Sequence, residues 1–174
     1  MKKHLFISLL LLVVSFTTIY SQEEKEKKPK EGWHLRGYYT LSNVITDSQV
    51  GDYRKTFNEI GLAVGWRRNR IRLNVKYTWD LQISKFQEYS LLYGREIPIY
   101  NKLTLDVYLG LVYLSETEDI IPKPTFGQLF VIPIRTEGVL KYKIADKFYT
   151  GLVSQFYLDY EDIWFIGLQI QYKL

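Results

Sequence analysis

The side chains that most often carry catalysis are few in this chain, and no motif brings them together. After residue 21 there is a single histidine, His34, and the chain has no cysteine. Four serines are candidate nucleophiles by residue type, but none of them lies in a recognisable nucleophile motif or is placed by the sequence beside a base. They are Ser42, Ser48, Ser115 and Ser154. The sequence therefore favours a protein that is not an enzyme. With one histidine and no cysteine, the sequence also predicts that the protein has no metal site. We expect no cofactor.

Charged residues form a larger set with regular spacing. Within residues 70–79, Arg72 and Lys76 alternate with apolar residues. A period of two places the two kinds of side chain on opposite faces of a β-strand. The same alternation runs through residues 163–174, which predicts another strand with one apolar and one polar face.

Runs with a period of two recur throughout the chain after residue 32, and no segment there has a helical period over ten or more residues. Each run is close to or above the ~9–11 residues that a tilted strand needs to cross a bilayer. Long connections, at 42–55 and 115–126, alternate with short ones such as 67–69, 98–101 and 144–146. We predict an all-β, eight-stranded antiparallel up-and-down transmembrane β-barrel. Its strands are expected near 33–41, 56–66, 70–79, 86–97, 102–114, 127–143, 147–158 and 163–174.

The direction in which the polar faces point separates two kinds of barrel. A soluble lipocalin-like barrel alternates too, but it holds its apolar residues inside. The polar faces here mix charges with small residues, as in Glu59, Gly61 and Ala63. This mixture suits a narrow packed lumen better than a water-exposed exterior, so we expect the apolar faces to meet lipid. Pro133 cannot donate to a ladder, and a bulge is expected beside it.

Residues 1–21 have the layout of a cleaved secretory signal. Lys2 and Lys3 precede an apolar run at 5–14, and a stretch containing Ser and Thr follows. The apolar run is shorter than the ~20 residues of a membrane-spanning helix. We therefore expect an exported protein.

Residues 22–32 are mostly lysine and glutamate and are predicted to be a flexible charged periplasmic lead-in to a barrel at 33–174. Removal of the signal takes away two lysines and no acids, so the formal net charge falls from +4 to +2. Aromatic residues do not interleave with a basic cluster. These features argue against a nucleic-acid partner.

Ten charged residues are expected to point into the lumen. The interior of an eight-stranded barrel is just wide enough for side chains to fill it. We interpret these residues as a polar plug, with a thin ion path as the alternative. The predicted lumen network is Arg36, Glu59, Arg72, Lys76, Glu88, Asp106, Arg135, Glu137, Lys141 and Lys173.

Aromatic residues fall near both ends of the predicted strands. Rings that are partly polar favour headgroup depth, so outer-membrane barrels carry an aromatic girdle at each interface. Short turns in such barrels face the periplasm, which places both termini there. The predicted girdle residues are Trp33, Trp66, Trp79, Tyr113, Trp164 and Tyr172.

The strand count, the connection pattern, the aromatic strand ends and the final residues 171–174, QYKL, resemble those of small eight-stranded outer-membrane barrels. This group includes the OmpX-like proteins and the membrane domain of OmpA-like proteins. The resemblance implies a place in the Gram-negative cell outer membrane, in contact with lipid and lipopolysaccharide. It also implies insertion by the barrel-assembly machinery, although Leu174 stands where a terminal aromatic residue is more usual. The resemblance has implications for the fold and the location of the protein, but not for its chemistry.

Several hypotheses for function follow. The first is a plugged barrel that acts as a structural, adhesive or accessory subunit, with another envelope protein as a candidate partner. The second is a narrow pore or porin-like uptake channel, and the third is an envelope-lipid-modifying enzyme using His34. The loops at 42–55 and 115–126 are further candidates for function, and the latter is locally acidic.

Overall fold

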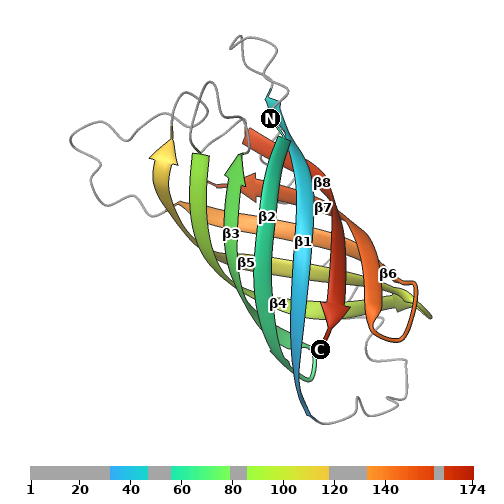
Figure 1. The fold of residues 1–174 in the computed structure, drawn as a ribbon. Coiled ribbons are helices and arrows are strands. Elements are labelled where there is room, and N and C mark those ends of the chain that lie inside the picture. Colours follow the sequence, from blue (N-terminus) through green and yellow to red (C-terminus); the bar gives the residue numbers. More distant parts are fainter. Residues whose placement is uncertain (1–31, 47–55, 79–85, 118–132, 159–162) are drawn as a thin grey trace. The chain divides into compact units, whose positions relative to one another are not determined.

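The computed structural model describes residues 32–46, 56–78, 86–117, 133–158 and 163–174. These residues form eight antiparallel strands in one closed barrel, in which each strand pairs with its neighbours in sequence and β1 pairs with β8 (Figure 1). The predicted fold class is confirmed. The strands are β1 (Trp33–Thr46), β2 (Thr56–Trp66), β3 (Asn69–Thr78), β4 (Phe86–Tyr100), β5 (Leu103–Thr117), β6 (Ile134–Lys143), β7 (Phe148–Tyr157) and β8 (Ile163–Lys173).

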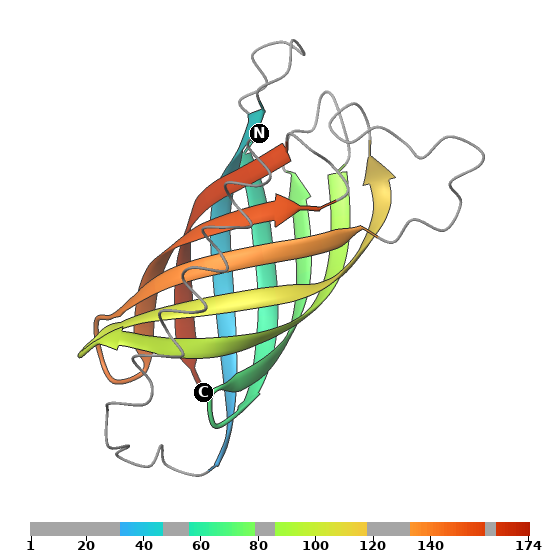
Figure 2. The ribbon, with the colours of Figure 1, turned by 180° about the vertical axis from the view of Figure 1, so that it is seen from behind.

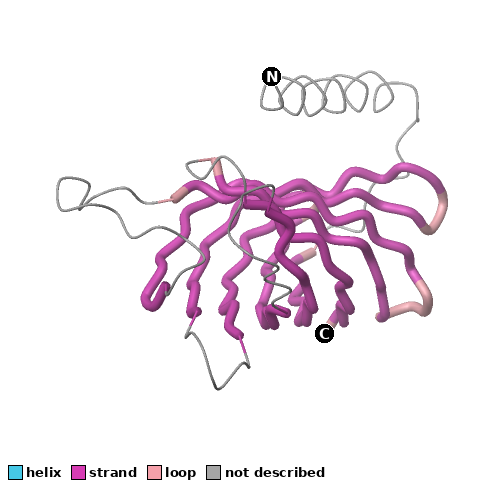
Figure 3. Tube along the Cα trace, turned by 90° about the horizontal axis from the view of Figure 1, so that it is seen from above, coloured by secondary structure: helices cyan, strands magenta, loops and turns pink. Residues whose placement is uncertain are grey.

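The two ends of the barrel differ in their connections. Short turns join β2 to β3, β4 to β5 and β6 to β7 at one end, here called the turn end. The other four connections leave from the opposite, loop end. Because β1 starts and β8 finishes at the turn end, the Leu174 amide donates to the Leu35 carbonyl there at 2.9 Å. Figures 1 and 2 show the strong tilt of the strands, and in Figure 3 strands make up nearly all of the described trace.

Three strands are longer than predicted, and one of them, β5, continues beyond residue 114 to Thr117, into the predicted connection 115–126. β1 continues beyond residue 41 because Ser42 and Asn43 pair with β2 on one side and with β8 on the other. Ladder bonds on both sides hold short polar residues that would otherwise favour a turn. β4 runs through Pro98 to Tyr100, with a register shift between these two residues. The turn is therefore Asn101–Lys102, and Asn101 has a φ of 39°, which asparagine tolerates better than most residues.

The bulge predicted beside Pro133 is not found between Pro133 and Lys143. β6 stays in register with β5 and with β7 along its whole length. Pro133 lies just before β6, and its carbonyl accepts a hydrogen bond from the Val112 amide at 3.0 Å. Pro133 has no N–H for the reciprocal bond to the Val112 carbonyl, but it lies just before the strand, where proline is tolerated.

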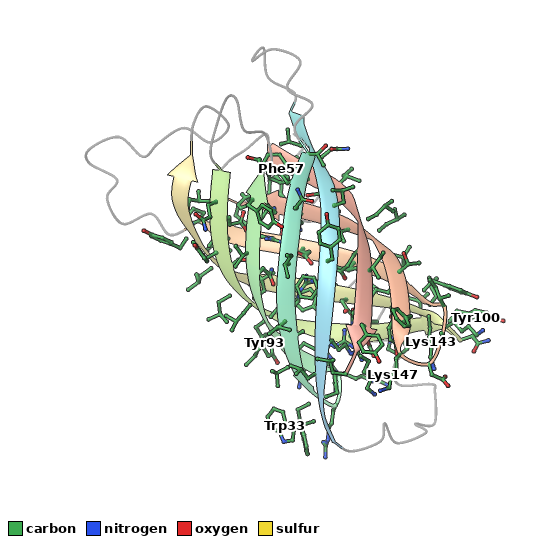
Figure 4. The ribbon with its side chains drawn as sticks, in the orientation of Figure 1. Trp33, Phe57, Tyr93, Tyr100, Lys143 and Lys147 are labelled. Carbon is green, nitrogen blue, oxygen red and sulfur yellow. The ribbon has the colours of Figure 1, made fainter. Side chains whose placement is uncertain are left out.

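The barrel has an inverted distribution of polarity. In β3 the charged side chains of Arg70, Arg72 and Lys76 are buried, whereas Ile71 and Leu73 are 54% and 61% exposed. The other strands follow the same pattern, and apolar side chains project from the outer surface (Figure 4). A soluble barrel would have the opposite arrangement, so the lipocalin-like alternative is wrong. None of the described residues belongs to a helix long and apolar enough to span a membrane.

Candidate functional site

The described lumen is filled by side chains in four layers along its axis. Strand β6 crosses three of them in order, with Arg135 and Glu137 nearest the loop end, then Val139, then Lys141. An apolar layer closes the loop end, formed by Phe57, Val112, Tyr157 and Phe165. A second apolar layer lies between the two charged layers and consists of Leu92, Tyr108, Val139 and Val153.

Arg135 is the centre of the upper charged layer, which lies under the loop-end apolar layer. Its Nη2 donates to both carboxylate oxygens of Glu59 at 2.8 Å and also pairs with Glu137. Its Nη1 donates to Glu88 Oε1 at 2.6 Å. These residues come from β2, β4 and β6, and all four side chains are fully buried or nearly so. One guanidinium thus joins three walls of the barrel.

Lys76 completes the charge balance of this layer. Its ammonium lies 3.8 Å from Glu59 and 3.7 Å from Glu88, and it donates to Tyr157 Oη at 3.0 Å. Gln155 accepts a further hydrogen bond from Lys76 and donates to Glu59 Oε2 at 2.9 Å. Arg72 is the third cation of the upper layer, so three cations face three carboxylates there. The layer therefore has no net charge.

Arg72 lies between two tyrosine rings. Its guanidinium carbon is 3.7 Å from the centroid of the Tyr38 ring and 4.5 Å from that of Tyr108. Each ring covers a glycine on the neighbouring strand, Gly61 under Tyr38 and Gly94 under Tyr108. A Cβ at either glycine would overlap the ring. The two glycines therefore make room for the sandwich that holds Arg72 in the lumen.

The lower charged layer, nearer the turn end, contains more cations than acids. Arg36 and Lys141 approach Glu96 Oε2 at 3.2 and 3.0 Å, and Arg70 pairs with both Glu96 and Asp106. Lys141 also lies 2.6 Å from Asp106. Three cations face two carboxylates. The Glu96 side chain is 22% exposed, so this layer is open to the turn end.

The structure places nine of the ten predicted lumen residues in these two layers, all buried; the tenth, Lys173, is half-buried at the turn end. Sequence reasoning left out Arg70, Glu96, Gln155 and Tyr157. Arg70 and Glu96 lie an even number of residues from Arg72 and Glu88, which were included, so strand parity was the signal that could have found them.

His34 lies in β1 at the turn end, half-buried against Gly65. A Cβ at position 65 would overlap its imidazole ring, and its Nε2 has no hydrogen-bond partner among the described residues. Those residues also contain no group of three His, Cys, Asp or Glu that could hold a metal ion. No base and nucleophile are brought together around His34 in the described chain.

Five of the six predicted girdle residues are described, and Trp79 lies outside the described residues. Trp33 and Trp66 pair across β1 and β2 at the turn end, with ring centroids 5.2 Å apart. Tyr172 packs there on Phe148 at 4.8 Å. Two more lie toward the loop end on the outer face, Tyr113 and Trp164.

No family model and no curated protein matches this sequence. Solved structures do match. A de novo designed transmembrane β-barrel has a TM-score of 0.58 at 9% identity, over 81% of this chain and 95% of that one. This chain has the fold of the small eight-stranded outer-membrane barrels.

Two natural outer-membrane barrels support the same conclusion. The N-terminal β-barrel domain of OprF from Pseudomonas aeruginosa has a TM-score of 0.50 at 16% identity, covering 80% of this chain and 97% of that domain. The Yersinia pestis outer-membrane protein Ail, determined in a phospholipid bilayer nanodisc, has a TM-score of 0.50 at 11% identity. The match covers 80% of this chain and 99% of that one. At these identities the likeness concerns the fold.

Proposed function

We propose that the protein is a non-conducting barrel of the outer membrane, which acts through its outer surface as a structural, adhesive or accessory subunit and not as a pore or an enzyme. The observation that carries this proposal is the layered lumen. A permeating ion would have to pass two apolar layers and displace paired charges from two charged ones. Both steps are costly in a medium of low dielectric constant.

The outer surface supports the membrane location. Large apolar side chains on all eight strands are exposed, including Leu62, Leu73, Leu111 and Leu168 at 51–61%. A surface of this kind is unfavourable in water and matches the hydrocarbon core of a bilayer. His34 favours a role without catalysis, because it lies against Gly65 and its Nε2 has no hydrogen-bond partner among the described residues.

Planar-bilayer recording tests the closed lumen. We expect the purified protein to give no discrete conductance steps, with a porin as positive control and heat-modifiable gel migration as proof that the sample is folded. Lys76→Gln removes one lumen charge and serves as the diagnostic variant. Discrete steps in the wild-type protein whose ion selectivity changes in Lys76→Gln would identify an ion path and contradict the proposal.

Co-purification tests the accessory role. The protein is extracted from native outer membrane in mild detergent and its stoichiometric partners are identified by mass spectrometry. A defined envelope partner supports the accessory role. Isolation as a lone barrel, with no loss of cell attachment when the gene is removed, would contradict both the accessory and the adhesive roles.

A further inference from the structure

Seven cationic residues encircle the turn end of the barrel, outside the lumen layers. Four belong to the turns and three to the strands, and together they are called the basic rim: Arg67, Arg68, Arg95, Lys102, Lys143, Lys147 and Lys173. Among the described residues of this region outside the lumen, the one acidic side chain is Asp146, which pairs with Lys143 at 3.0 Å. Figure 4 shows Lys143 and Lys147 at the same end as Trp33.

Backbone hydrogen bonds join each turn to the next strand pair, so the basic rim is continuous. The carbonyl of Arg68 accepts from the amide of Glu96 at 2.7 Å, next to Arg95. The carbonyl of Lys102 accepts from the amide of Lys143 at 2.9 Å, and that of Lys147 accepts from Lys173 at 2.8 Å. Each bond therefore brings the cation of a turn beside a cation of the following strand.

The basic rim lies at the turn-end edge of the apolar belt, which is the band of exposed apolar side chains on the outer face of the barrel. Arg95 is exposed and is two residues beyond Tyr93 in β4, so both point outward from the barrel, and Tyr93 is 59% exposed. An arginine on a lipid-facing surface is unfavourable at the bilayer centre and well tolerated near the interface. Arg95 pairs with Asn69, and Asn69 with Trp66, so Arg95 lies level with the aromatic residues of the turn end.

Aromatic rings accompany the cations at this depth. The Arg67 guanidinium lies 6.0 Å from the Trp66 ring, and the Lys147 ammonium lies 5.7 Å from the Tyr172 ring. Cations beside interfacial aromatic rings suit a lipid surface better than an acidic protein surface, because the rings need apolar contact and the cations need phosphate.

The opposite end has the opposite charge. The four connections at the loop end, 47–55, 79–85, 118–132 and 159–162, carry eight acidic and four basic residues in the sequence. We propose that the basic rim binds the phosphate groups of anionic phospholipids in the leaflet at the turn end. This inference rests on the membrane location proposed above and adds a headgroup class to it.

Quenching of tryptophan fluorescence by brominated lipids tests the inference. Trp79→Phe and Trp164→Phe leave Trp33 and Trp66 as reporters at the turn end. In bilayers with dibrominated phosphatidylglycerol or phosphatidylcholine, we expect a preference for phosphatidylglycerol on the order of tenfold. The preference should fall to near equality in R68Q/R95Q/K102Q and persist in R54Q/K55Q/K85Q, which removes the same charge from the loop-end connections.

Each alternative outcome has a distinct meaning. No preference in the wild-type background, or equal loss in both triple variants, would overturn the headgroup site. Wild-type indifference together with cross-linking of Lys102 to an acidic envelope protein would also overturn it in favour of a protein partner. Reporters that brominated phosphatidylcholine does not quench would instead contradict the membrane location itself.

Discussion

Arg135 is the residue on which the upper charged layer depends most. It pairs with Glu59, Glu88 and Glu137, and all of them are buried. Removing one partner from a buried network leaves uncompensated charge. We therefore expect Arg135→Leu to lower the free energy of unfolding by about 3–5 kcal/mol, measured by urea titration in lipid vesicles.

Lys143→Gln is the control for Arg135→Leu. It also removes a cation from β6, but its partner Asp146 is fully exposed. Exposed pairs contribute little, so its urea midpoint should match that of the wild type. Equal midpoints for Arg135→Leu and Lys143→Gln would show that the buried network is not important for stability.

Gly61 allows the Tyr38 ring to lie against the strand and to cover Arg72. A Cβ at position 61 would overlap that ring and approach the Leu73 carbonyl at 2.6 Å. We expect Gly61→Ala to destabilise the barrel by about 1–3 kcal/mol through overpacking, measured by the same urea titration. Gly138→Ala is the control, because nothing lies within 4 Å of a Cβ there; an equal loss in both variants would point to strand propensity instead of the sandwich.

Sequence reasoning could predict which side chains enter the lumen, but not which of them meet. Strand parity assigns Glu59, Arg72 and Arg135 to the inner face. It carries no information on which residues face each other across the lumen, because that depends on strand tilt and stagger. The contact between Arg135 on β6 and Glu59 on β2 is therefore a finding of the structure alone.

At the scale of elements, strand positions were predictable because each apolar run repeats every two residues. Strand ends were less so. Ser42 and Asn43 favour a turn by local preference, but pairing on both sides extends β1 to Thr46. Pro133 suggested a bulge by the same local reasoning, whereas the register shifts of the described strands lie in β4, between Gln87 and Glu88 and between Pro98 and Tyr100. Local preference cannot register a neighbour that is distant in sequence.

The lipid-facing side of β8 provides a test of the membrane belt. Leu168 lies in the middle of this strand and is 61% exposed. We expect Leu168→Arg to lower the unfolding free energy in vesicles by about 2–4 kcal/mol, as for arginine near a bilayer midplane. Tyr100→Arg, at the turn end, should cost only about 0–1 kcal/mol. Equal effects at both positions would mean that the belt does not match a bilayer.

At the scale of the whole molecule, the chain lacks cysteine, so single thiols can report its orientation. We predict that the turn end faces the periplasm, as short turns do in outer-membrane barrels. Lys102→Cys should then react with an impermeant maleimide only after the outer membrane is permeabilised. Thr125→Cys, in the connection between β5 and β6, should react in intact cells. The reverse labelling pattern would mean that the loop end, and not the turn end, faces the periplasm.

The pairing of β1 with β8 has a consequence for the order of events during biogenesis. Gln169 donates to Thr40 at 3.0 Å, across a sequence separation of 129 residues. Until β8 arrives, β1 has one unsatisfied edge, and an open edge can pair with another chain. Contacts between such distant residues also form slowly. Until the barrel closes, the free edge of β1 is therefore a site at which the protein can aggregate, and any factor that shields this edge acts before closure.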